Sequence, residues 1–148
     1  MMNLDALLDI TGLDVLDHLD RQVAVPVVDG LQAQGDLIVI PAGMTPTVTT
    51  WPSSRWRPLP AEGLELVRGI AGNNPHTLVA EPGTCELTPD VEDPLRLAIA
   101  MFTNTAPAYL IHPEHGGTGI APGRWLVRRQ RERGNSRGRG TGVVLVAD

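Results

Sequence analysis

The sequence predicts a mainly β protein, a small barrel or sandwich with an N-terminal amphipathic helix. After Arg21, short apolar or alternating runs are separated by Gly, Pro, Asn and Asp, which is the pattern of short strands joined by turns. The 13 prolines, and the lack of helical stretches long enough for parallel crossovers, disfavour an α/β fold. A chain of 148 residues suits one domain that buries its own core.

Residues 1–22 are expected to form a helical appendage. From Asn3 to about Arg21, apolar residues recur at the three- and four-residue spacing of an amphipathic helix. Asn3 or Asp5 is placed to cap it. Thr11-Gly12 interrupts the pattern, and glycine costs about 1 kcal/mol relative to alanine inside a helix, so one helix and two short ones are both open. The appendage either packs on the body or docks a partner.

Residues 23–148 are expected to form the β domain, with an Arg/Gly-rich hairpin tip at 134–142. The expected strands are Val23–Val28, Asp36–Ile40, Leu64–Ile70, His76–Glu81, Thr84–Thr88, Leu95–Met101, Ala108–Ile111, Arg124–Arg131 and Val143–Val146. Thr45–Pro60 is rich in proline and is predicted to be a loop or irregular edge. Trp51 and Trp56 either pin this stretch to the body or bind a ligand.

The charge pattern excludes several kinds of chemistry. The formal net charge is −5, and every basic residue is an arginine. Without lysine, the chain has neither a phosphate-binding Gly-Lys loop nor a Schiff-base residue. Its serines lie outside any Gly-x-Ser-x-Gly sequence, so a serine hydrolase has no support.

Cysteine use and hydropathy point to a cytoplasmic protein without membrane association. Cys85 is the only cysteine, so no internal disulfide can form. No apolar run approaches the roughly 20 residues that span a bilayer. The N-terminus carries acids where a secretory signal needs a basic flank.

The strongest chemical pattern is the grouping of three of the four histidines in the segments GNNPHTL and HPEHGG. If these two turns lie at the same end of the fold, His76, His112 and His115 could converge on a divalent metal such as zinc or iron. Glu81 or Glu114 would then serve as fourth ligand or as base. Three protein ligands with one open position is the arrangement by which zinc activates water. The alternative is structural: His112 and His115 hydrogen-bond the turn backbone, and His76 lies on the surface.

A second candidate surface lies in the arginine-rich strand Arg124–Arg133 and the glycine-rich segment after it. Arginines fall on both faces of this strand, so its far half should project beyond the core. The arginines expected to contact an anion or a partner are Arg128, Arg131, Arg133, Arg137 and Arg139. Nucleic-acid phosphates are the less favoured target, because the chain is acidic and has only 3% aromatic residues.

The favoured target of these arginines is the acidic N-terminal segment of the same chain or of a second subunit, which would make a homo-oligomer. Five aspartates precede the first basic residue: Asp5, Asp9, Asp14, Asp17 and Asp20. A simply solvated hairpin is the remaining alternative.

Two resemblances bear on the fold. Gly72, His76, Glu81 and Pro122-Gly123 resemble motif pieces of the cupin family, which implies a small metal-binding β-barrel. Over residues 34–132 the chain more closely resembles small uncharacterised proteins of bacteria and mobile elements. The motifs that carry this second likeness are Gln34-Gly35-Asp36, Gly72 to His76, His112-Pro113-Glu114-His115, Pro122-Gly123 and Arg129-Gln130-Arg131-Glu132. That group implies no reaction.

Function is therefore open between classes at this point. The first hypothesis is a metal-binding barrel whose bound water could act in catalysis. The second is a non-enzymatic accessory or assembly protein that uses the acidic helix and the arginine ribbon, and the third is a weak nucleic-acid binder. Whether the protein is an enzyme is not decided by the sequence.

Overall fold

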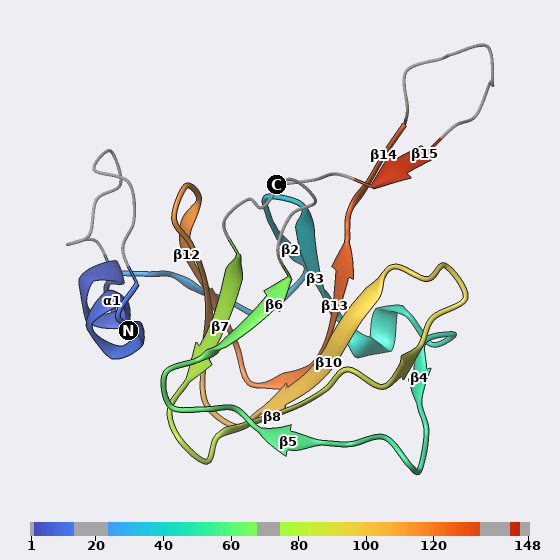
Figure 1. The fold of residues 1–148 in the computed structure, drawn as a ribbon, viewed down its shortest axis with the longest axis horizontal. Helices are drawn as coiled ribbons and strands as arrows, with labels where there is room; N and C mark the ends of the chain where they lie inside the picture. Colours follow the sequence, from blue (N-terminus) through green and yellow to red (C-terminus); the bar gives the residue numbers. More distant parts are fainter. Residues whose placement is uncertain (1, 14–23, 68–74, 134–142, 146–148) are drawn as a thin grey trace.

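The computed structural model describes residues 2–13, 24–67, 75–133 and 143–145. It is mainly β with one α-helix at the N-terminus (Figure 1). Two larger sheets face each other in a sandwich-like arrangement, and no closed barrel forms among the described strands. Within these ranges, no helix is both long and apolar enough to cross a membrane.

The first sheet has five strands, in the order β1-β12-β11-β7-β6. These are β1 (Val27–Val28), β12 (Gly116–Ile120), β11 (Ala108–His112), β7 (His76–Ala80) and β6 (Leu64–Val67). Neighbours are antiparallel except for β1, which runs parallel to β12. Strand β6 forms one edge of this sheet.

The second sheet has six strands, in the order β2-β3-β13-β10-β8-β5. These are β2 (Gln32–Gln34), β3 (Leu37–Pro41), β13 (Gly123–Arg129), β10 (Ala98–Asn104), β8 (Cys85–Thr88) and β5 (Arg57–Pro58). Smaller elements are the 3-10 turn η1 (Ala42–Met44), the pair β4 (Thr49–Thr50) with β9 (Val91–Glu92), and the pair β14 (Arg131–Arg133) with β15 (Val143–Leu145).

The main core lies between the two sheets. Alternate residues of facing strands point inward, as the period of two requires. Sheet one contributes Leu78 and Leu110, and sheet two contributes Phe102, Trp125 and Val127, all of them almost fully buried. Cys85 belongs to the same core, and burial raises the pKa of its thiol to about 11, so it remains protonated near neutral pH.

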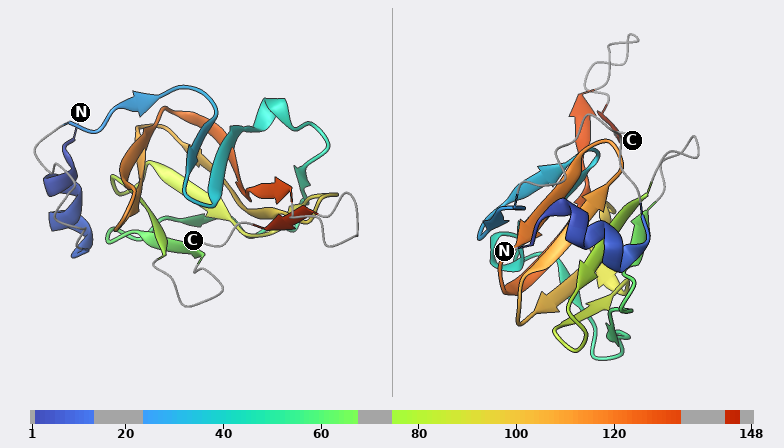
Figure 2. Two further views of the ribbon diagram at one scale, coloured as in Figure 1. Left: turned by 90° about the horizontal axis from the view of Figure 1, so that it is seen from above. Right: turned by 90° about the vertical axis from the view of Figure 1, so that its left-hand side faces the viewer.

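Helix α1 (Leu4–Thr11) covers part of the outer face of the first sheet (Figure 2). The Asn3 side chain caps it by accepting a hydrogen bond from the Ala6 N–H, 2.8 Å away. Gly12 ends it with a φ of 69°, a conformation that glycine adopts without strain. The interruption expected at Thr11-Gly12 is therefore the end of the helix. The predicted continuation towards Arg21 falls on residues 14–23, outside the described ranges.

The outer face of the second sheet has its own cover. Ile40, Val48, Met101 and Leu126 form a separate buried cluster there. Trp56 packs against this cluster, and the Arg124 guanidinium lies 5.3 Å from the centre of its ring. The prediction for Trp56 is thus confirmed as packing. For Trp51, which is 44% exposed, the same prediction is not confirmed.

Most of the expected strands are present with shifted ends. The expected strand Leu95–Met101 starts later, at Ala98, because Asp93 accepts hydrogen bonds from the Leu95, Leu97 and Ala98 N–H groups and holds the chain in a turn. Strands β2 and β12 were not expected. The stretch Thr45–Pro60, expected to be irregular, contains the short strands β4 and β5.

Candidate functional sites

The three histidines of the two turns lie together at one end of the sandwich. His76 begins β7 and His112 ends β11. Because these strands are antiparallel neighbours, the two residues lie at the same end of the strand pair. His115 belongs to the turn that follows. The ring centroids of His76 and His112 are 4.5 Å apart, as are those of His112 and His115, while those of His76 and His115 are 6.4 Å apart.

Both ring nitrogens of His76 are held by hydrogen bonds inside the protein. Nδ1 lies 2.9 Å from Oε1 of Gln34, and Nε2 lies 2.9 Å from Oδ1 of Asp36. All three side chains are buried. Since the amide nitrogen of Gln34 donates to the Leu110 carbonyl, the amide oxygen is the group that accepts from Nδ1 of His76. His76 is therefore an interior residue, not a surface one.

Gln34 ties one sheet to the other. From strand β2 of the second sheet, its side-chain nitrogen donates to the Leu110 carbonyl at 2.9 Å, in strand β11 of the first. The neighbouring Gln32 donates in the same manner to the Gly119 carbonyl at 3.1 Å. These bonds close the sandwich along the β2 side. Because Gln34 and Asp36 also hydrogen-bond the His76 ring, His76 belongs to the polar network on that side.

His112 and His115 differ in exposure. His112 is buried, and its Nδ1 accepts a hydrogen bond from the Glu114 N–H at 3.0 Å, so this ring supports the turn backbone. His115 and Glu114 are exposed. Glu81 follows the last residue of β7, at the opposite end of that strand from His76.

The metal prediction must be weighed against this geometry. The rings lie close together, yet His76 could ligate a metal only by giving up Gln34 or Asp36. In the described part of the chain, no group of three or more His, Cys, Asp or Glu residues is arranged to hold a metal ion. The three-histidine site with Glu114 stays a prediction, whereas Glu81 lies at the other end of β7 from His76 and is not placed to complete that site.

The arginines of the predicted partner surface lie in different environments. Arg128 forms an ion pair with Asp93, with Nη2 2.7 Å from Oδ1, and only 13% of its side chain is exposed. Burial alone would raise the pKa of Asp93, but hydrogen bonds from Arg128 and from two backbone N–H groups outweigh it and lower that pKa. Arg131 and Arg133 lie in β14, and Arg137 and Arg139 fall outside the described ranges.

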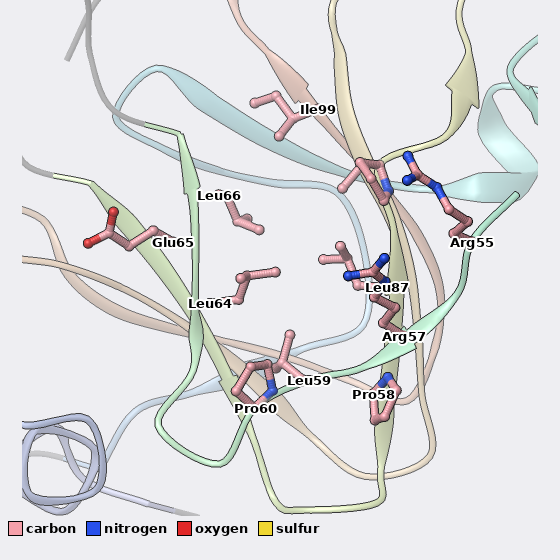
Figure 3. Close-up of a pocket in the computed structure, with 12 residues that line it drawn as sticks. Arg55, Arg57, Pro58, Leu59, Pro60, Leu64, Glu65, Leu66, Leu87 and Ile99 are labelled. Atoms are coloured by element: carbon pink, nitrogen blue, oxygen red, sulfur yellow. The ribbon is translucent and has the colours of Figure 1, made fainter.

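A cavity opens on the other side of the sandwich, between the edge strands β6 and β5 (Figure 3). Its volume is about 450 Å³. Leu64 and Leu66 of β6 form one wall, and Leu59, Leu87 and Ile99 form the other. Leu59 and Leu87 are members of the main core, so this cavity, here called the edge pocket, leads directly between the sheets.

Two arginines line the edge pocket, and one of them is paired with an aspartate. Arg55 forms a two-point ion pair with Asp90, through Nε at 3.0 Å and Nη2 at 3.1 Å. Hydrogen bonds from Arg55 lower the pKa of Asp90 to about 2. Arg57 makes no hydrogen bond or ion pair with any residue in the described ranges, and it is exposed.

A second cavity, of about 550 Å³, lies outside the sandwich, between α1 and the first sheet. Leu7 and Ile10 of the helix and Val79 and Tyr109 of the sheet line it. Its walls thus depend on the N-terminal appendage, whereas those of the edge pocket belong to the two sheets.

Sequence reasoning did not find the edge pocket. Its residues come from four strands and the segments between them, and none carries a recognisable motif. The only available signal was Arg57 in a stretch of prolines and tryptophans.

Residues 33–130 match a family described as a domain of unknown function (DUF8820). Because the match covers more than half of the chain, the chain belongs to this family. The matched segment contains the three histidines, Gln34, Asp36 and every residue of the edge pocket, but not α1. Comparisons with curated proteins and with solved structures gave no match.

Proposed function

We propose that this protein binds a small, mainly apolar ligand in the edge pocket. The observation that carries the proposal is a cavity of about 450 Å³ whose walls are continuous with the core of the sandwich. Ligand sites are concave, mainly apolar, and usually about 300–1,000 Å³ in volume. The proposal assigns binding and leaves catalysis open.

The two sides of the sandwich support this assignment by their contrast. On the β2 side, Gln32 and Gln34 link the sheets through hydrogen bonds to backbone carbonyls. On the other side, β6 and β5 are the edges of two different sheets, and the described strands form no pairing between these two edges. The chain segment 59–63 links β5 to β6. Among the described residues, the edge pocket is the place where the space between the sheets opens on this side.

The family match adds support. Every residue of the edge pocket lies inside the matched segment, whereas the cavity under α1 needs Met2, Leu7 and Ile10, which precede it. A function that belongs to the family domain itself is better served by the edge pocket.

The test is the binding of a neutral apolar fluorescent probe, N-phenyl-1-naphthylamine, to the full chain and two matched variants. Ile99→Trp fills the edge pocket with a larger ring, and Ile10→Trp does the same in the cavity under α1. We expect saturable binding that Ile99→Trp removes and Ile10→Trp leaves intact. Leu64→Gln makes the opposite wall polar and should also weaken binding. This second pocket variant keeps the test valid if Ile99→Trp fails to fold. No saturable binding, or loss only in Ile10→Trp, would contradict the proposal.

As a second candidate function we propose the three-histidine metal site. The observation that favours it is the proximity of the three rings, with centroids 4.5 Å and 6.4 Å apart. Elemental analysis of protein purified without a histidine tag, followed by zinc titration of the metal-free form, tests it. A stoichiometric metal that is lost in both His112→Ala and His115→Ala would support the site, and the absence of binding in the wild type would remove it.

A further inference from the structure

We infer that the ligand of the edge pocket is an amphiphilic monoanion, with its apolar body between the sheets and its acidic group at Arg57. This inference rests on the proposed function and specifies its ligand. It is carried by the position of one charged side chain on the inner face of the second sheet.

Strand pairing shows which way Arg57 faces. Arg57 lies directly opposite Leu87 in the antiparallel pair of β5 and β8, and opposite residues share a face of the sheet. Leu87 is buried in the main core, and so is Leu59, two residues after Arg57. By the same alternation Arg57 faces inward, at the mouth of the pocket, and Figure 3 shows it beside Leu87.

Of the two arginines that line the pocket, Arg57 is the one placed to bind an anion. Asp90 neutralises Arg55 through a two-point ion pair. Arg57 forms no hydrogen bond or ion pair with any described residue. Its positive charge is one of the smaller causes of the lowered pKa of Asp90. A carboxylate bound at the mouth would give the guanidinium a charge-assisted partner.

The guanidinium groups at the mouth set how many acidic groups the ligand carries. Arg57 offers one guanidinium there, because that of Arg55 is already paired with Asp90. Glu65 also borders the pocket, but its side chain points away from the cavity (Figure 3). A single acidic group on an apolar chain or ring is therefore the chemistry that fits.

Edge strands also carry inward-facing charges for another reason, which is to prevent pairing with other chains. The two explanations differ in what they predict for binding. If Arg57 serves only to protect the edge, its replacement should leave ligand affinity unchanged.

The experiment compares decanoate with decan-1-ol as competitors of N-phenyl-1-naphthylamine, with decanoate kept below its micelle concentration. In the wild type we expect decanoate to bind more tightly than the alcohol. Arg57→Gln should weaken decanoate roughly five- to tenfold and leave decan-1-ol unchanged, while Arg57→Lys should keep most of the difference. Arg129→Gln, a change in strand β13 away from the pocket, is the control for net charge.

Further readouts separate the two levels of the proposal. The affinity for decanoate should fall as salt is added, and that for decan-1-ol should not. Each methylene added to the carboxylate should raise affinity about three- to fourfold until the pocket is full. An unchanged decanoate-to-decanol ratio in Arg57→Gln would overturn the anion assignment and leave apolar binding intact. Failure of the probe and of both competitors to bind would overturn the proposed function as well.

Discussion

Asp90 and Asp93 lie three residues apart and both pair with arginine, yet their surroundings predict different energetic roles. The Asp93 side chain is 2% exposed and its partner Arg128 is 13% exposed, whereas the values for Asp90 and Arg55 are 24% and 66%. Removing one member of a buried pair leaves an unpaired charge, while exposed pairs contribute little.

We therefore expect Asp93→Asn to lower the free energy of unfolding by about 3 kcal/mol. The loss includes the hydrogen bonds that its carboxylate accepts from the Leu95, Leu97 and Ala98 N–H groups. Asp90→Asn is the matched control and should change stability little. Urea denaturation measures both. Equal effects of the two substitutions would contradict this assignment.

The lowered pKa of Asp93 also predicts an acid dependence. A carboxyl group whose pKa is lower in the folded than in the unfolded state stabilises the fold above its unfolded pKa of about 3.9. That contribution is lost as the pH falls through the folded value. The wild type should therefore lose stability below about pH 4, and Asp93→Asn should lose less over the same range. Parallel pH profiles for the two proteins would refute the prediction.

Gln34 allows a test of the closed side of the sandwich. Gln34→Met keeps the size of the side chain, but leaves the His76 Nδ1–H and the Leu110 carbonyl without these partners. We expect a loss of about 2–4 kcal/mol in the free energy of unfolding, since unsatisfied buried polar groups cost most. Gln32→Met, which removes a single bond to the Gly119 carbonyl, should cost about 1 kcal/mol. A smaller loss for Gln34→Met than for Gln32→Met would contradict the proposed role of Gln34 in joining the two sheets.

At this scale, the sequence indicated the grouping of the histidines but not their partners. His76, His112 and His115 stood out because they are few and lie in two turns. The partners of His76 are 42 and 40 residues away in the chain, at Gln34 and Asp36, and no local spacing links them. These contacts follow from the packing of the two sheets against each other.

Among the elements, strand β12 was the clearest omission. Its sequence GGTGI has few side chains that favour strands, and glycine usually weakens them. The structure explains why glycine is needed. A Cβ at Gly119 would lie 2.6 Å from the Pro26 carbonyl oxygen, just before strand β1, which runs parallel to β12 as its neighbour.

Two glycines of β12 therefore predict opposite outcomes. Gly119→Ala should destabilise the protein by about 1–3 kcal/mol, because backbone atoms must move to make room. Gly117→Ala places its Cβ 3.4 Å from a flexible Leu4 methyl group and should change stability little. Thermal unfolding compares the two. A similar melting temperature for both variants would show that β1 is not packed against β12 as described.

Displacement of β1 should also reach the helix. The backbone of Val25 donates to the Met2 carbonyl, and Asn3 forms an isolated bridge with Ala24, so the segment before β1 holds the start of α1. Hydrogen exchange in Leu7 and Leu8 should be faster in Gly119→Ala than in Gly117→Ala. Equal exchange would show that the helix is held by its apolar contacts alone.

For the whole molecule, alternating hydrophobicity predicted the β class, and strand pairing between distant segments determined the sandwich. The edge pocket follows from that pairing, because the sheets are joined by side chains along the β2 side and remain apart between β5 and β6. Only the three-dimensional order of the strands brings Leu64 and Leu66 opposite Leu87 and Ile99.

The most direct test of the central claim is a titration of decanoate followed by NMR, with ¹³C-labelled methyl groups of leucine and isoleucine. Binding in the edge pocket should produce saturable shifts in Leu64, Leu66 and Ile99, all of which line it. The methyl groups of Leu7 and Ile10, in the cavity under α1, should stay unchanged. Shifts confined to Leu7 and Ile10, or the absence of saturable shifts, would contradict a ligand site between the two sheets.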